Sequence, residues 1–165
     1  MAMRGAARSL KARALQWLAQ REQSRAELRR KLLPHALAEV EADEMVAAER
    51  VDALLDWLAE HNYLSSVRFA ESRVRARSAR YGNLRIRQEL KLHQVALDPE
   101  AAQALKESEL QRAVDLLARK FAAPPANLAE RAKQARFLSG RGFSPEVIAR
   151  ALRRDGAGRH ATFDG

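Results

Sequence analysis

The sequence predicts an all-α protein made of three tandem three-helix repeats that together form an elongated, curved molecule. A short Arg-rich helical pattern recurs along the chain, and each copy ends near a leucine that is followed five positions later by an apolar residue. These leucines are Leu32, Leu90 and Leu138. Alanine and leucine, both strong helix formers, carry most of the apolar composition. The sequence lacks the apolar–polar alternation of strands, which leaves the helical interpretation without a competitor.

The first repeat is predicted at residues 9–60. Its helices are expected at 9–21, from 25 to the first proline, and at 44–60. Ser24 is a candidate N-cap with Glu27 as its capping-box partner, and Pro34 is expected to stop that helix. Asp43 is the predicted cap of the third helix.

The second repeat is predicted at residues 62–107. Its helices are expected at 66–79, 83–93 and 98–107, the last beginning at a capping aspartate before a proline. Helical spacing directs three apolar side chains of the first helix inward and three arginines outward. The apolar residues are Phe69, Ala70 and Val74, and the arginines are Arg73, Arg77 and Arg80.

The third repeat is predicted at residues 108–154, which brings the expected number of helices to nine. Its helices are expected at 110–121, 128–139 and 145–154. Ser144 is the predicted cap of the last helix, and the Gly-Arg-Gly run at 140–142 ends the helix before it. Residues 155–165 are expected to form a flexible tail.

Composition excludes several classes of protein. The 165 residues include no cysteine, which rules out disulfides, thiolate chemistry and Cys-based zinc sites. No apolar stretch is long enough to span a membrane, and no secretory signal is present, so a cytoplasmic protein is expected. A monomer is expected as well.

Charge is unevenly distributed along this basic chain, whose formal net charge is +9. Residues 38–60 form an acidic block, whereas the stretches before and after it are rich in arginine and lysine. A basic helical surface is typical of proteins that bind nucleic acid or an acidic partner, although a solvated surface gives the same pattern.

Candidate catalytic or metal-binding groups are few. The four histidines, His35, His61, His93 and His160, lack the spacing that would place two imidazoles on one metal ion. His35 and His93 occupy equivalent repeat positions, which favours a polar contact over a catalytic base. The acidic run 39–44 lacks the ligand spacing and the turn glycine of a calcium loop. We therefore expect no metal, no cofactor and no enzymatic activity.

Several segments resemble one known family. Residues 62–72 (NYLSSVRFAES) and 85–90 (RIRQEL) resemble the central signature of the RecX regulatory proteins. Residues 24–32 (SRAELRRKL), 135–138 (ARFL) and 141–143 (RGF) look like the first and third repeats of that family, in the expected order. Departures from the family pattern are Ser65-Ser66, where an acidic loop is usual, and the prolyl turn and acidic insert of the first repeat.

The resemblance implies nine helices in three repeats and a function in recombinational DNA repair and the SOS response. RecX-like proteins modulate, and generally inhibit, the RecA recombinase by engaging its filament on single-stranded DNA, which depresses ATP hydrolysis, strand exchange and repressor co-cleavage. RecA and single-stranded DNA, bound directly or within the filament, are the partners that this resemblance implies.

Helical facing predicts which cations contact the filament or its DNA. They are Arg25, Arg29, Arg30, Arg73, Arg77, Arg80, Arg85, Arg87, Lys91, Arg136, Arg141, Arg150, Arg153 and Arg154. Two alternatives remain open from the residues alone. One is a helix-turn-helix regulator that reads nucleic acid with the helix after Ser24, and the other is a helical adaptor for an acidic protein.

Overall fold

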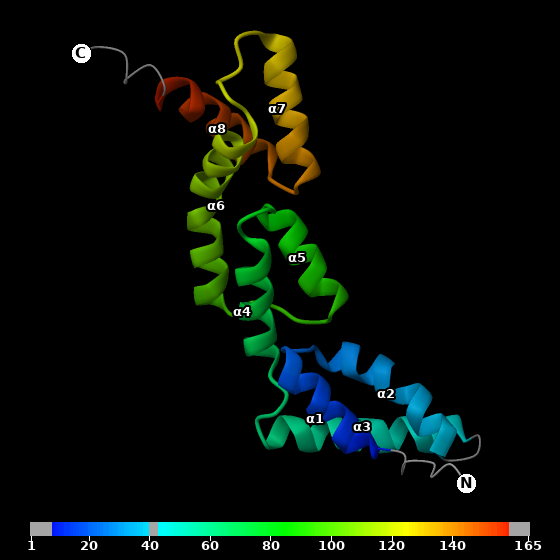
Figure 1. Ribbon diagram of the computed structural model, residues 1–165. Coiled ribbons are helices and arrows are strands. Elements are labelled where there is room, and N and C mark those ends of the chain that lie inside the picture. Colours follow the sequence, from blue (N-terminus) through cyan, green and yellow to red (C-terminus); the bar gives the residue numbers. More distant parts are fainter. Residues whose placement is uncertain (1–7, 40–42, 159–165) are drawn as a thin grey trace. The chain divides into compact units, whose positions relative to one another are not determined.

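The computed structural model describes residues 8–39 and 43–158, whose regular structure is entirely α-helical. This confirms the all-α class. Eight helices follow one another in this part of the chain (Figure 1). They are α1 (Leu10–Gln20), α2 (Arg25–Glu39), α3 (Glu44–Glu60), α4 (Ser66–Arg77), α5 (Asn83–Leu92), α6 (Pro99–Lys120), α7 (Leu128–Gly140) and α8 (Pro145–Gly158). The helices divide between two compact units, Met1–Phe69 with His93–Val95, and Ala70–Leu92 with Ala96–Gly165.

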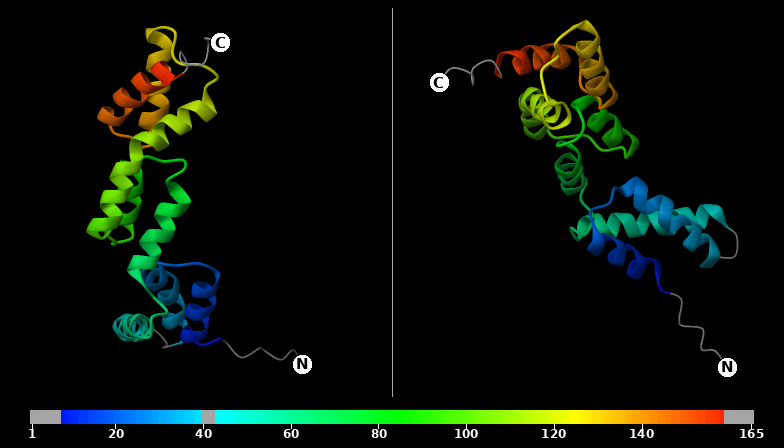
Figure 2. Two further views of the ribbon diagram at one scale, coloured as in Figure 1. Left: turned by 90° about the vertical axis from the view of Figure 1, so that its left-hand side faces the viewer. Right: turned by 45° about the horizontal axis from the view of Figure 1, so that its top comes forward.

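The first unit contains α1, α2 and α3, which pack on one another in the further views of Figure 2. The apolar stripe of each helix meets in one core, where Leu28, Leu32, Leu55 and Leu58 are fully buried. Burial of such side chains stabilises a fold by about 1.5–3 kcal/mol each. The core therefore holds together three helices that would be marginal in isolation.

Helix α2 differs from its prediction because it does not stop at Pro34 but runs through it to Glu39. A proline inside a helix costs about 3 kcal/mol, since its ring removes one backbone donor and crowds the preceding turn. The residues beyond it offset this cost, because Ala36 is fully buried and Leu37 packs against the core of the unit. Tertiary burial therefore overrides the local breaker.

The start of α2 is fixed by two side chains. Ser24 Oγ accepts a hydrogen bond from the Glu27 amide at 3.1 Å, which confirms the predicted N-cap. The Glu27 carboxylate, however, pairs with Arg21 at 3.1 Å and with Lys31 at 3.2 Å. Burial alone raises the pKa of Glu27, but the hydrogen bonds and charges of Arg21 and Lys31 outweigh it and lower this pKa to about 2.

The second unit contains most of α4 and all of α5 to α8. Its core lies between α6, α7 and α8, where Leu117, Leu138 and Ala151 are fully buried. The leucines that define the repeated phrase are buried as well, since Leu90 is 2% exposed and Leu138 is 0% exposed. The repeated pattern in the sequence therefore marks positions in the core.

Helix α6 replaces two of the nine predicted helices. The segments expected at 98–107 and 110–121 are one continuous helix, Pro99–Lys120. After Pro99 at its start, no proline or glycine lies within it to break the backbone. The Ser108 hydroxyl, exposed between the two segments, donates to the Leu105 carbonyl at 3.1 Å. The expectation of nine helices is thus wrong for the described residues.

The predicted helix starts agree with the capping bonds. Asp43, Asp98 and Ser144 each accept backbone hydrogen bonds at the first turns of α3, α6 and α8. Helix α8 extends to Gly158, so the first residues of the predicted tail are helical, while residues 159–165 lie outside the described part. The exact repeat boundaries and the curved, elongated form stay predictions.

Candidate functional site

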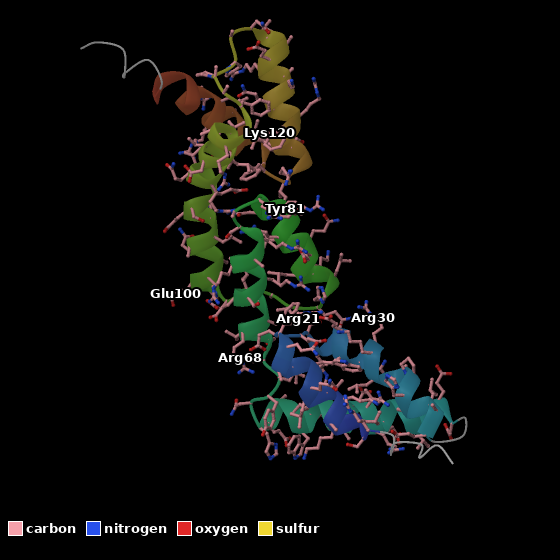
Figure 3. The ribbon with its side chains drawn as sticks, viewed as in Figure 1. Arg21, Arg30, Arg68, Tyr81, Glu100 and Lys120 are labelled. Carbon is pink, nitrogen blue, oxygen red and sulfur yellow. The ribbon has the colours of Figure 1, made fainter. Side chains whose placement is uncertain are left out.

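Two of the three arginines predicted on α2 are paired with carboxylates of α3. Arg29 Nε lies 2.9 Å from Asp52 Oδ1, and a guanidinium nitrogen of Arg25 lies 2.8 Å from Asp56 Oδ1. The hydrogen bond from Arg29 lowers the pKa of Asp52 and keeps that carboxylate charged. Arg30 is exposed, as Figure 3 shows. Much of the positive charge on this face is therefore balanced within the first unit.

A pocket of about 1020 Å³ opens on the same face of the first unit. Its wall includes Arg30 and the paired Arg29 and Asp52, together with the apolar Leu33. Carboxylate and guanidinium groups share this wall, so the pocket has mixed charge. A polyanion finds less net attraction there than the arginine content of α2 predicts.

Arg73 and Arg77 of α4 do not form the free outward stripe that the sequence predicts. Both reach Glu89 of α5, at 3.2 Å from Arg73 and 3.1 Å from Arg77. The side chains of Arg73 and Glu89 are each only 23% exposed, so this contact is part of the packing between the two helices. Arg80 lies in the turn after α4 and is exposed. The prediction of one outward stripe is therefore wrong for Arg73 and Arg77.

A cluster of three arginines surrounds Tyr81, which lies in the turn between α4 and α5 (Figure 3). The guanidinium carbons lie 4.5 Å from the ring centroid for Arg85, 5.6 Å for Arg141 and 5.7 Å for Arg77. Such cation–π contacts hold a guanidinium in place without neutralising its charge, so Arg85 and Arg141 keep theirs, whereas Arg77 is paired with Glu89. The Tyr81 cluster therefore presents fixed positive charge on the second unit.

A second pocket, of about 390 Å³, lies beside this cluster. Four cations line it, namely Arg80, Arg119, Lys120 and Arg141, and its apolar wall is made by Ala79, Leu116 and Phe137. In the described part of the chain, none of the ion pairs involves any of these four cations. We call this site the cationic pocket. Its charge, unlike that of the first unit, is not balanced by a neighbouring carboxylate.

Helix α6 holds the turn that carries Tyr81. The guanidinium of Arg112 donates to the carbonyls of Ser78 at 3.0 Å and Tyr81 at 2.9 Å, and to the side chain of Asn83. The backbone amide of Asn83 donates to the Glu109 carboxylate at 2.8 Å. Burial lowers the pKa of Arg112, but its carbonyl partners still hold a cation in place. These bonds fix the Tyr81 cluster before any partner arrives.

Two glycines bring the Tyr81 turn against the turn after α7. The Gly82 amide donates to the Arg141 carbonyl at 2.8 Å, and the Leu84 amide donates to the Gly142 carbonyl at 3.1 Å. A Cβ atom at Gly82 would overlap the Gly142 backbone, and Gly142 has φ +83°. The close approach of these turns places Arg141 next to Tyr81.

The other predicted cations have varied surroundings. Arg87, Lys91, Arg136 and Arg153 are exposed on the second unit. Arg150 lies 3.8 Å from Glu146, one helical turn away, and both side chains are largely exposed. The side chain of Arg154 lies outside the described residues.

Sequence reasoning missed Tyr81, Phe137, Arg119 and Lys120. Arg119 and Lys120 stand in the last turn of α6 directly before Phe121, where cations are commonly found near a helix end. Nothing in their own segment indicates that Arg80 and Arg141, far away in the sequence, line the same pocket. Tyr81 and Arg141 lie in turns, where helical periodicity does not predict the direction of a side chain.

The histidines make structural contacts. His93 Nδ1 lies 3.0 Å from Ser24 Oγ, and its ring lies 4.9 Å from that of Phe69. The His61 ring stacks on Trp57 at 4.1 Å. His160 lies outside the described residues. Over residues 8–39 and 43–158, no three histidine, aspartate or glutamate side chains gather where they could hold a metal ion.

None of the described helices is both long and apolar enough to cross a bilayer.

Comparison with known proteins gives consistent matches. Residues 67–105 match the second three-helix domain of RecX, and residues 107–152 match the third. The chain is 51% identical over 146 residues to the regulatory protein RecX of Ralstonia pickettii, covering 87% of this chain and 86% of that protein. It is 40% identical over 149 residues to the protein of the same name from Neisseria meningitidis, covering 88% and 90%.

A solved structure matches as well. The crystal structure of RecX from Lactobacillus salivarius superposes with a TM-score of 0.65, at 20% identity, over 88% of this chain and 93% of that one. This likeness confirms the fold, and the identities to the Ralstonia and Neisseria proteins define the relationship. On this combined ground the chain belongs to the RecX family of regulatory proteins.

Proposed function

We propose that this protein inhibits the RecA recombinase by binding its filament on single-stranded DNA through the second unit. As a RecX family protein, the chain is a regulator of RecA and not an enzyme. The proposal adds that the regulation is inhibitory and that the second unit provides the binding surface. Binding to the filament lowers its ATP hydrolysis, strand exchange and co-protease activity, and the protein acts as a monomer in the cytoplasm.

One observation carries the choice of surface, namely the uncompensated cations of the second unit. Arg85 and Arg141 stand over Tyr81, and four cations, Arg141 among them, line the cationic pocket. None of the ion pairs in the described part of the chain involves any of these cations. A nucleoprotein filament offers DNA phosphates and acidic side chains together, and guanidinium groups bind both. The arginines of α2, in contrast, are already paired with Asp52 and Asp56.

The same pairing disfavours the helix-turn-helix alternative. A recognition helix must present its first residues to the edges of the bases. Arg25 and Arg29 of α2 are instead bound to carboxylates of α3. The second alternative, an adaptor for an acidic protein, is one of the outcomes that the filament experiment distinguishes.

The experiment measures RecA ATPase on single-stranded DNA while the protein is titrated. We expect inhibition by the wild type that weakens by powers of ten in apparent affinity between about 50 and 200 mM salt. The double variant Arg85→Ala/Arg136→Ala removes two exposed cations of the second unit and should inhibit about tenfold less well. The matched control, Arg25→Ala/Arg29→Ala, removes two paired arginines of the first unit and should inhibit nearly as well as the wild type.

Two results would contradict the proposal. A wild-type protein that leaves the ATPase of the filament unchanged removes the inhibitory function. A control that loses as much inhibition as the second-unit variant removes the choice of surface. The protein alone should hydrolyse no ATP, and binding to RecA without DNA at equal affinity would support the adaptor alternative.

A further inference from the structure

We infer that the cationic pocket of the second unit binds a phosphate group of the single-stranded DNA in the filament. This inference rests on the proposed function and deepens it, because it assigns one site to one chemical class of ligand. The pocket is lined by Arg80, Arg119, Lys120 and Arg141 in a volume of about 390 Å³. Like charges gathered so closely repel one another, and an anion relieves that repulsion.

The positive charge of the pocket is larger than the negative charge that the nearby helix end supplies. The carbonyl end of α6 faces this region, because Arg119 and Lys120 lie in its last turn. The dipole of a helix is equivalent to roughly half a negative charge at that end. Four cations outweigh it, so the pocket stays strongly positive.

Three of the four cations are held in place before a ligand arrives. Arg119 donates to the Ala79 carbonyl at 2.8 Å. Arg141 lies over two rings, with its guanidinium carbon 5.6 Å from the Tyr81 centroid and 5.3 Å from that of Phe137. Lys120 Nζ lies 6.0 Å from the Phe137 centroid. Groups that are already oriented lose less conformational entropy on binding, which favours a small anion with several acceptor oxygens.

A phosphodiester strand fits these surroundings better than a single carboxylate. One carboxylate compensates one positive charge, whereas a nucleic-acid strand brings a charge with every nucleotide. The helices of the same unit also carry further exposed cations, Arg87 on α5 and Arg136 on α7. The apolar wall of Ala79, Leu116 and Phe137 suits the sugar face of a nucleotide.

The test measures binding of a fluorescent oligodeoxythymidylate by anisotropy over a range of salt concentrations. The pocket variant is Arg80→Ala/Lys120→Ala, because both side chains are exposed. We expect its affinity to fall about tenfold, and the slope of log affinity against log salt to become shallower by about 1.4, as for two lost phosphate contacts on a single strand.

Two control variants accompany it. Lys106→Ala/Lys133→Ala removes two exposed positive charges of the same unit outside the pocket and should change the affinity far less. Arg80→Lys/Lys120→Arg keeps both charges and should retain the wild-type slope. Circular dichroism verifies that each variant is folded. An oligonucleotide with neutral methylphosphonate linkages should remove the difference between the pocket variant and the wild type.

The outcomes separate this inference from the proposed function. A pocket variant that binds the oligonucleotide normally but binds the filament weakly would show that the pocket takes acidic side chains of RecA, which overturns the phosphate assignment and leaves inhibition intact. A pocket variant that matches the Lys106/Lys133 control in both assays overturns it too, as does a wild type that binds no oligonucleotide. Loss of the proposed function shows separately, as an unchanged RecA ATPase in the presence of the wild type.

Discussion

The two units of this protein differ in how much of their positive charge is paired with carboxylates. In the first unit, Arg25 and Arg29 are bound to Asp56 and Asp52 on the neighbouring helix. In the second unit, Arg73 and Arg77 are paired with Glu89, but the cationic pocket has no carboxylate partner among the described side chains. The difference shows that arginine content alone does not locate a binding surface. What decides is whether the fold places a carboxylate against each guanidinium.

The largest effect is expected from a substitution that disrupts the turn positioning the Tyr81 cluster. Gly82→Ala should destabilise the second unit by about 3 kcal/mol or more, because the new methyl group overlaps the Gly142 backbone. It should also weaken filament binding, since Arg141 lies next to that contact. Thermal unfolding followed by circular dichroism measures the loss. Gly140→Ala is the matched control, because a Cβ there meets nothing within 4 Å; equal melting of the two variants would contradict the role of the close approach.

The second prediction concerns the buried carboxylate of the first unit. The pKa of Glu27 is lowered from 4.5 to about 2, so its pairing stabilises the fold above about pH 4.5 and is lost as the pH falls toward about 2. After allowance for screening of its exposed partners, this contribution is about 2 kcal/mol. Glu27→Gln should remove it. Fluorescence of Trp17 and Trp57, both in the first unit, follows the acid transition.

Glu49→Gln serves as its control, because Glu49 is exposed on α3. That variant should keep the wild-type dependence of stability on pH. An acid transition of the Glu27→Gln variant that matches the wild type would show that the pairing with Arg21 and Lys31 does not contribute to stability.

A smaller effect distinguishes packing arginines from binding arginines. Arg73→Glu/Arg77→Glu removes both partners of Glu89 and gathers like charges, which should cost about 1–2 kcal/mol of stability in the second unit. Arg75→Glu, at an exposed position of the same helix, should cost much less. Urea unfolding measures both. Unchanged stability of the double variant would restore the interpretation of these arginines as a free stripe.

The smallest expected effect would make the first unit resemble the second. Asp52→Asn/Asp56→Asn releases Arg25 and Arg29, and should change stability by less than about 1 kcal/mol while strengthening oligonucleotide binding a few-fold. The control Glu49→Gln/Glu60→Gln removes the same charge from exposed positions of α3. If both variants gain affinity equally, net charge and not release of the arginines is the cause.

Local signals predicted much of the fold. Asp43, Asp98 and Ser144 announce helix starts because a cap acts on amides two or three residues away. Pro34 misled the prediction, since the burial of Ala36 that overrides it depends on α3. The two segments that form α6 were separated although no breaker lies between them.

The site was harder to predict because it depends on contacts between distant segments. Helical periodicity gives the direction of Arg77 from α4, but not that Glu89 lies across from it. The cationic pocket is lined by residues of the turn after α4, the end of α6 and the turn after α7. The two turns lie side by side because the backbones of Gly82 and Gly142 approach closely. The charge composition indicated that this protein has a basic surface for binding a partner. The location of that surface could be found only from the fold.

The continuous helix α6 makes the second unit sensitive to changes in chain length. Each residue of an α-helix turns the chain by about 100°, so one inserted residue between Leu105 and Ala113 would rotate Arg119 and Lys120 away from the turn that carries Arg80. An insertion of four residues nearly restores the facing but moves the helix end by about 6 Å. Insertions and deletions are therefore tolerable in the loop at Pro124-Pro125 but not in α6, because the length of this helix sets the spacing of the cations.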